Sequence, residues 1–272
     1  MSETIKVSPA RRLVESAIMV AIGTVLSVLR ILHLPYGGSV TIACMLPVVI
    51  ISFRHGIRWG IITGFAFGVL QQLLGLHNLS YVTTWQSIVA VILLDYIVAY
   101  MVQGFGGVFR KLSSQPRALM LGSLLVCILR FLCHVISGAT VWAGLSIPTA
   151  AALVYSVSYN ATYMIPETIV TCALAYYVGS ILDFREENIG KMVRREKDSF
   201  PFAKWIAGLL LAAVVTFDVR NIFAYLQNAE TGDFDITGLA SVNWTLLGIV
   251  TLVCAGVAVC LLYVAKGKKE VA

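Results

Sequence analysis

The chain has 272 residues, of which 58% are hydrophobic and only 12% are charged, and its formal net charge is +6 at pH 7. A composition this apolar and this poor in charge excludes a soluble globular domain. Basic loops that face anionic lipid account for the positive charge, so no nucleic-acid partner is needed. We therefore expect an integral membrane protein.

Long apolar runs predict eight membrane passes. A bilayer core about 30 Å thick needs about 20 helical residues, and the strands of a barrel would alternate polar and apolar residues instead. We expect an all-α polytopic membrane helix bundle. The second run is short and carries Pro47, so that pass is expected to be tilted, broken or only partly spanning. The runs cover residues 13–32, 39–53, 59–76, 85–103, 118–142, 150–182, 203–226 and 244–265.

The basic residues predict the orientation of these passes. If the N-terminus lies inside, all of the 20 Lys and Arg residues except Arg30, Arg130 and Arg220 fall on the inner side. The loops predicted to lie outside hold no basic residue. This asymmetry follows the positive-inside rule. We expect a multi-pass protein of the cell membrane with both termini in the cytoplasm.

A densely charged stretch divides the chain. Residues 183–202 are expected to form a cytoplasmic linker between a six-helix core, residues 1–182, and two additional transmembrane helices within 203–272. Asp218 and Arg220 in the added helices are two residues apart and do not share a helix face. We interpret them as interfacial residues or as contacts to neighbouring helices.

Small residues recur at four-residue spacing in two helices. Gly60, Gly64 and Gly68 share one face, as do Ala17 and Ala21. Such faces let another backbone approach closely. For the glycines we expect packing inside this chain, whereas for the alanines internal packing and docking on a partner remain open.

Several polar side chains lie where apolar ones are expected. Charge inside a membrane is costly and usually marks a site or a structural pair. A carboxylate, an imidazole, an amide and aromatic faces suit a flat, cationic, hydrogen-bonding organic molecule. We find no metal spacing, nucleotide-binding loop or catalytic constellation, so we expect neither an enzyme nor a cofactor. The polar set is Asp95, Tyr96, Arg130, His134, Trp142, Tyr155, Tyr159, Asn160 and Glu167.

Purely structural roles compete with a binding site. Asp95 could neutralise Arg130 within the bundle, and His134 could be a hydrogen-bonded packing residue. Trp142 and Tyr155 could belong to an interfacial aromatic belt. The residues alone leave these alternatives open.

Three segments resemble the thiamine-specific substrate-binding (S) components of energy-coupling factor (ECF) vitamin transporters. The resemblance covers roughly residues 10–182. The matching segments are LLDYIVAYMVQGFGGVF at 93–109, RFLCHVISGATVWAG at 130–144 and VYSVSYNATYMIPE at 154–167. The family fold is a six-helix bundle with a vitamin pocket at its outer side.

The resemblance implies roles for individual residues. Asp95 would lie near the thiazolium ring, with Tyr96 as its polar aromatic neighbour. His134 and Trp142 would pack on the rings of the ligand. Tyr155 and Asn160 would complete the polar contacts.

The resemblance also implies partners. Ala17 and Ala21 match the AxxxA motif of the family, which docks on a transmembrane coupling protein that itself joins two ATPase subunits. The family often has a lid Trp after the first helix, but this chain has LHLPYGGS there. Either Tyr36 makes that contact, or the ligand differs. Residues 200–272 have no counterpart in the six-pass family.

These observations predict the substrate-binding membrane subunit of an ATP-driven vitamin uptake system, with thiamine as its ligand. One alternative is an S component for another heteroaromatic compound, such as a thiamine-precursor pyrimidine, which would not need Asp95. The other is a proton-coupled secondary transporter that uses Asp95, Glu167 or His134 as a relay.

Overall fold

The computed structural model describes residues 7–34, 38–141, 149–192, 201–225 and 236–266. The chain divides into two compact units. Unit 1 runs from Met1 to Met192, and unit 2 runs from Val193 to Ala272. Both units are built mainly of helices, so the predicted all-α membrane bundle is confirmed.

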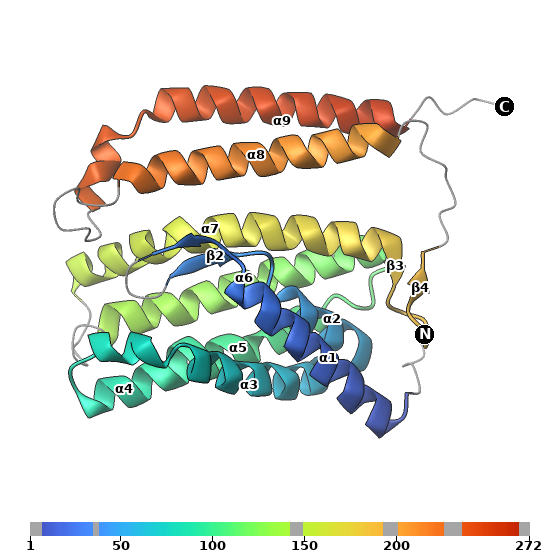
Figure 1. Ribbon diagram of the computed structural model, residues 1–272, viewed down its shortest axis with the longest axis horizontal. Helices are drawn as coiled ribbons and strands as arrows, with labels where there is room; N and C mark the ends of the chain where they lie inside the picture. Colours follow the sequence, from blue (N-terminus) through green and yellow to red (C-terminus); the bar gives the residue numbers. More distant parts are fainter. Residues whose placement is uncertain (1–6, 35–37, 142–148, 193–200, 226–235, 267–272) are drawn as a thin grey trace. The chain divides into compact units, whose positions relative to one another are not determined.

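Unit 1 holds the helices of the predicted core together with two short strand pairs (Figure 1). Helices are labelled α and strands β, and the label η marks a 3-10 or π-helical segment. In chain order the elements are α1 Pro9–Val28, β1 Arg30–His33, β2 Ser39–Thr41, α2 Leu46–His55, α3 Ile57–Leu74, η2 Leu76–Tyr81, α4 Trp85–Val91, η3 Ile92–Val98, α5 Ala99–Met101, η4 Val102–Gly107, α6 Gln115–Thr140, α7 Ala150–Ile181, β3 Leu182–Asp183 and β4 Gly190–Lys191.

Local sequence explains where these helices begin. Ser8 caps α1, since its hydroxyl accepts a hydrogen bond from the backbone N–H of Arg11 at 3.3 Å, and Pro9 opens the helix. Thr149 caps α7 in the same way through the N–H of Ala152. A polar cap and an early proline each satisfy or remove N–H groups that the first turn leaves unpaired.

The second predicted pass, expected to be tilted, broken or only partly spanning, is helical over only part of its range. Residues 39–41 form strand β2 rather than helix, and α2 begins only at Leu46, with Pro47 in its first turn where proline is tolerated. At 10 residues, α2 is about 15 Å long and cannot cross a bilayer core of about 30 Å. Its residues from Leu46 to Arg54 are buried, so it is a core helix.

Five described helices are long and apolar enough to cross a membrane. Helices α1 and α8 are not among them, so the number of passes stays a prediction. The five cover Ile57–Leu74, Trp85–Gly107, Gln115–Thr140, Ala152–Ile181 and Trp244–Ala265.

A buried arginine holds one end of unit 1 together. Arg54 at the end of α2 donates from Nε and Nη2 to the carboxylate of Glu15 in α1, at 3.0 Å each. It also donates to the backbone carbonyls of Phe184, Glu186 and Glu187, which follow α7. The start of α1, the end of α2 and the end of α7 therefore meet at the same end of the bundle.

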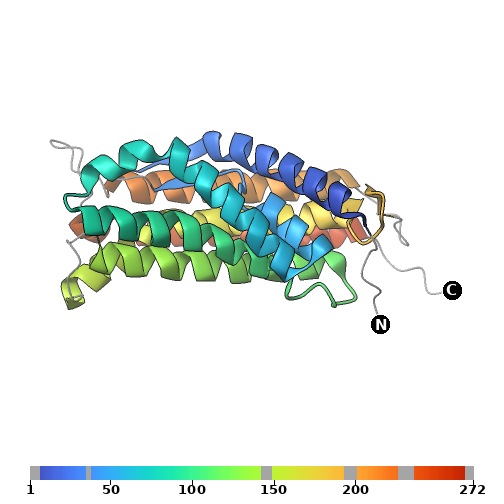
Figure 2. The same cartoon turned by 90° about the horizontal axis from the view of Figure 1, so that it is seen from below.

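The glycine face of α3 packs inside this chain, as predicted. Figure 2 shows the helices of unit 1 from below, where α1 and α2 lie against α3. A Cβ at Gly68 would lie 2.7 Å from the carbonyl oxygen of Tyr96, and one at Gly64 would meet the carbonyl oxygen of Tyr100. Gly60 faces Ser52 and Gly104. These glycines let the segment from η3 to η4 pack backbone to backbone on α3.

Unit 2 is a helix hairpin. It contains α8 Pro201–Tyr225, η5 Ile236–Ser241 and α9 Trp244–Lys266. The hydroxyl of Thr251 in α9 donates to a carboxylate oxygen of Asp218 in α8 at 2.7 Å. Asp218 thus contacts a neighbouring helix, one of the two roles expected for it.

A single methyl group on the glycine face should destabilise unit 1. Gly64→Ala places that group against the Tyr100 carbonyl, and backbone cannot yield as a flexible side chain does. We expect a loss of about 1–3 kcal/mol, as for other overpacked sites, measured as a lower unfolding temperature in detergent. Gly256→Ala in α9 is the matched control, because nothing described lies within 4 Å of that position. An equal, small effect of both changes would contradict tight packing at Gly64.

Candidate functional site

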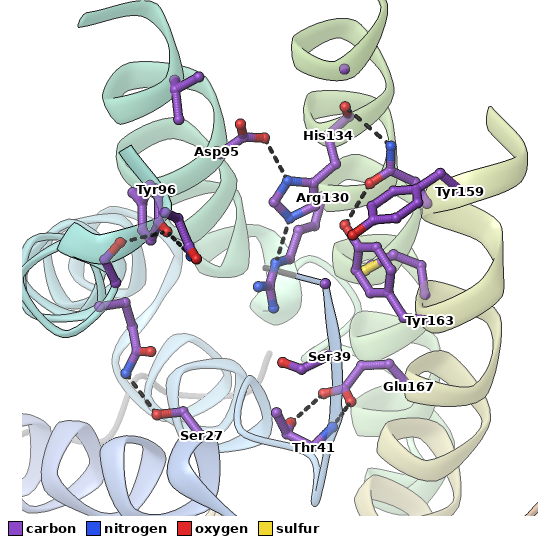
Figure 3. Close-up of a pocket in the computed structure, with 18 of the residues that line it drawn as sticks. Ser27, Ser39, Thr41, Asp95, Tyr96, Arg130, His134, Tyr159, Tyr163 and Glu167 are labelled. Atoms are coloured by element: carbon purple, nitrogen blue, oxygen red, sulfur yellow. Dashed lines mark hydrogen bonds and ion pairs between the residues drawn. The ribbon is translucent and has the colours of Figure 1, made fainter. Parts of the chain in front are cut away.

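Unit 1 encloses a cavity of about 420 Å³ among its polar side chains (Figure 3). Small-molecule sites commonly have volumes of about 300–1,000 Å³. The wall is drawn from α1, the β1–β2 hairpin, α3, η2, η3, α5, α6 and α7. Five predicted site residues meet in it: Asp95, Tyr96, His134, Tyr155 and Asn160.

Asp95 lies in the π-helical segment η3, in the middle of the long helical stretch from Trp85 to Gly107. One of its carboxylate oxygens is 2.7 Å from Nδ1 of His134, and the other accepts a hydrogen bond from the hydroxyl of Ser137 at 2.5 Å. Both partners belong to α6. Single π-helical turns within helices are frequent at functional sites, and here the turn carries the carboxylate and its neighbour Tyr96.

Arg130 determines the tautomer of His134. Its Nε donates to Nε2 of His134 at 3.2 Å, and a guanidinium can only donate. Nε2 must therefore accept, which puts the ring proton on Nδ1, where it is donated to Asp95. Asp95 is therefore hydrogen-bonded to a neutral His134, which is in turn bonded to Arg130. The simple Asp95–Arg130 pair considered from the sequence is thus replaced by a chain that runs through the imidazole.

The guanidinium of Arg130 has a second partner. Its Nη2 donates to the hydroxyl of Tyr100 at 3.2 Å, and its Cζ lies 4.6 Å from the centre of that ring. Charge–ring contacts of this kind are favourable when both groups are withdrawn from water. Arg130 is thereby held in the cavity wall by α5 and by its own helix.

One face of α7 supplies aromatic rings and an amide. The rings of Tyr155 and Tyr159 are stacked with centres 6.3 Å apart, and Tyr163 packs edge-on against Tyr159 at 6.0 Å. Asn160 donates to the carbonyls of Ser156 and, at 3.3 Å, of His134. Its side-chain oxygen accepts from the hydroxyl of Tyr163 at 2.5 Å. The amide orientation is therefore fixed from both ends.

The opposite wall carries Tyr96 and further amides. Asn78 donates to the hydroxyl of Tyr96 at 2.9 Å, and Gln71 donates to the hydroxyl of Ser27 at 2.9 Å. The side-chain oxygen of Asn78 is buried and has no hydrogen-bond partner among the described residues. Asn78 lines the cavity, but this oxygen has almost no accessible surface there.

Several wall residues are not among the predicted site residues. In the sequence, Arg130, Tyr159 and Glu167 stand out as polar residues in apolar helices. This signal could have identified them as residues of the cavity wall. Tyr163 and Asn78 carry no such signal. Arg30 also lines the cavity, because α1 ends at Val28 and places Arg30 in β1. The expectation that the loop after the first helix holds no basic residue is therefore wrong.

Two predicted site residues, Tyr36 and Trp142, lie outside the described residues. Ala17 and Ala21 lie away from the cavity, on an exposed face of α1 that also carries Leu13, Val14 and Ile18. No group of three His, Cys, Asp or Glu side chains in the described part of the chain is placed to hold a metal ion.

Comparisons with known proteins identify the family of this chain. The model of a family described as thiamine transporter protein matches residues 13–187. The thiamine transporter ThiT of Bacillus subtilis (strain 168) is 37% identical over an alignment of 179 residues. The match covers 60% of this chain and 86% of that protein.

A solved structure shows the same fold. ThiT from Listeria monocytogenes superposes with a TM-score of 0.50 at 20% sequence identity, and the match covers 62% of this chain and 93% of that one. The region matched by the family model contains every described residue of the cavity wall and ends before α8. The chain is therefore a membrane protein that belongs to the thiamine transporter family.

Proposed function

We propose that the cavity binds thiamine from the outer side of the membrane and that this chain is the substrate-binding subunit of an ATP-driven uptake system. The observation that carries the proposal is the Asp95 carboxylate, held by His134 and Ser137 beside the aromatic face of α7. Family membership supports thiamine as the ligand.

The chemistry of thiamine fits this wall. Its thiazolium ring has a permanent positive charge on a nitrogen that carries no hydrogen, so that ring needs a counter-charge more than a hydrogen-bond acceptor. Asp95 offers such a charge. Each of its oxygens already takes a hydrogen bond from α6, so the carboxylate would act on the ring through its charge rather than as a hydrogen-bond acceptor. The rings of Tyr155 and Tyr159 offer faces for stacking.

Two other functions remain as alternatives. A thiamine-precursor pyrimidine lacks the thiazolium cation and would leave the charge of Asp95 unused. A proton-coupled carrier would use Asp95, Glu167 or His134 as a relay and would need no ATPase. Uptake that persists in cells without any coupling ATPase would favour the carrier.

We further propose how the chain is organised. Residues 1–182 would bind the vitamin, 183–202 would form a cytoplasmic linker, and 203–272 would add two helices outside the binding core. Both termini would lie in the cytoplasm. The concentration of basic residues in the predicted inner loops supports this orientation.

Thiamine should bind the purified, full-length protein directly. Titration calorimetry in detergent or nanodiscs measures the heat, and quenching of tryptophan fluorescence would report a ring beside Trp142. The precursor pyrimidine alone should bind more weakly, because it brings no cation to Asp95. Absence of heat with thiamine at millimolar concentration, or preference for the bare pyrimidine, would contradict the assignment.

Removal of the charge of Asp95 should discriminate between ligands. Asp95→Asn should weaken thiamine binding by about 1–4 kcal/mol, the order of magnitude for two opposite charges about 4 Å apart, and should weaken binding of an uncharged thiazole analogue less. Affinities for both ligands are measured by calorimetry. Asp183→Asn in β3, outside the cavity, is the control and should change neither affinity. Equal losses for the two ligands would mean that Asp95 only supports the bundle.

We also propose that Ala17 and Ala21 dock on a transmembrane coupling protein that joins two ATPase subunits. Both alanines are exposed on α1, which supports docking over internal packing. Ala17→Trp or Ala21→Trp should abolish uptake while thiamine binding persists, because bulk at small residues holds helices apart. Uptake and binding are measured on the same preparations. Ile62→Trp, at another exposed apolar position in α3, is the control. Loss of binding in the alanine variants would contradict docking.

A further inference from the structure

Glu167 is a second carboxylate of the cavity wall, and it is almost fully buried, with 2% of its surface exposed. It lies in α7, directly after Pro166. A charged side chain at such depth is costly unless hydrogen bonds satisfy it. The hydrogen-bond donors to Glu167 therefore indicate its role.

One residue donates to both carboxylate oxygens of Glu167. The backbone N–H of Thr41 donates to Oε2 at 2.5 Å, and the Thr41 hydroxyl donates to Oε1 at 2.7 Å. Figure 3 shows this pair at the side of the cavity opposite Asp95. The Thr41 hydroxyl also accepts from the N–H of Cys44 at 3.3 Å, in the turn before α2. Glu167 thus joins α7 to the end of strand β2 and to the chain that leads into α2.

The β1–β2 hairpin depends on such contacts for its position. An isolated two-stranded hairpin is marginally stable at best, and the register of this one is irregular between Arg30 and Leu32. A second contact to α7 lies one helical turn before Glu167, where a Cβ at Gly38 would be 2.8 Å from the ring of Tyr163. Residues four apart share a helix face. Tyr163 and Glu167 therefore hold the hairpin along one face of α7.

The hairpin in turn builds part of the cavity. Arg30, Gly38, Ser39 and Thr41 all line it. Displacement of β2 from α7 would move this wall and would leave the buried N–H of Thr41 without its acceptor. The carboxylate of Glu167, with both oxygens bonded to Thr41, faces the hairpin as a structural acceptor.

We propose that Glu167 is a positioning residue that fixes strand β2, and with it the hairpin wall of the cavity, through its two bonds to Thr41. The inference rests on the proposed function only where ligand affinity is concerned. The position of the hairpin can be measured without any ligand.

Substitutions can separate the shape of Glu167 from its charge. In Glu167→Gln the amide oxygen can accept from the Thr41 N–H, while the amide nitrogen can donate to the Thr41 hydroxyl oxygen, so the connection survives without charge. Glu167→Leu has similar bulk but removes both acceptors. Thr41→Val keeps the charge of Glu167 and the backbone bond but removes the hydroxyl bond.

Hydrogen exchange of the full-length protein without ligand is the primary measurement. Peptides that cover residues 38–45 should exchange at least about tenfold faster in Glu167→Leu, which corresponds to about 1.4 kcal/mol of lost local protection. Thr41→Val should show a smaller increase, and Glu167→Gln should stay closest to the unsubstituted protein. Peptides from α6 serve as the internal reference, and their unchanged exchange shows that each variant is folded.

Thiamine affinity provides the second measurement. The positioning role predicts that affinity falls in the same order as hairpin protection, with Glu167→Leu losing more than Thr41→Val and Thr41→Val more than Glu167→Gln. If Glu167→Gln loses as much affinity as Glu167→Leu while its hairpin stays protected, Glu167 acts on the ligand by its charge and the inference is wrong.

The exchange result also keeps this inference distinct from the assignment of the ligand. Unchanged hairpin exchange in both Glu167→Leu and Thr41→Val would overturn the inference even if thiamine binds. Faster exchange in a protein that does not bind thiamine would support the positioning role and contradict the proposed function alone. If Glu167→Leu does not fold, the other two variants still test the inference, because exchange of the hairpin should be faster in Thr41→Val than in Glu167→Gln.

Discussion

The cost of burying charge in an apolar bundle organises the cavity of this protein. Asp95, Arg130 and Glu167 lie in its wall, and each is bonded to a residue of another element. Because a lost partner would leave an uncompensated buried charge, these bonds constrain how η3, α5, α6, α7 and β2 can be arranged. The same side chains that make the interior polar enough for a ligand therefore hold the helices around it.

Asp95 and Glu167 are both carboxylates in one cavity, but their surroundings differ. Asp95 accepts from two side chains of α6, and His134, one of these donors, is held in turn by Arg130. Glu167 accepts from a backbone N–H and a hydroxyl of one strand residue. The first arrangement places a charge beside aromatic rings, and the second connects a hairpin to a helix. The two residues carry the same chemical group, and it is their hydrogen-bond partners that distinguish their roles.

Much of this site could be predicted from the sequence, because polar residues stand out in apolar helices. Asp95, Tyr96, His134, Tyr155 and Asn160 are recognisable in this way, with help from a family resemblance, and they line one cavity. The long helices could be predicted for a related reason, since an apolar run of membrane length is typical of a transmembrane helix.

The parts that could not be predicted depend on non-local contacts. By sequence, residues 30–32 continue one apolar run and residues 39–41 begin the next. In the structure they belong to the paired strands β1 and β2, and Thr41 of β2 is bonded to Glu167, 126 positions away. The π-helical turn at Asp95 has no pattern of its own in the sequence. The two small-residue faces look alike as sequence, but Gly64 packs against backbone while Ala17 is exposed. Only the packing of distant segments distinguishes these cases.

The most direct test of the central claim is an experimental structure of the full-length protein with thiamine bound. The account predicts ligand density inside the cavity, with the thiazolium ring within about 6 Å of the Asp95 carboxylate, the range over which an opposite charge acts strongly. The ring system should lie against the aromatic face of α7. Thiamine bound elsewhere on the molecule, or bound in the cavity with its cation turned away from Asp95, would contradict the account.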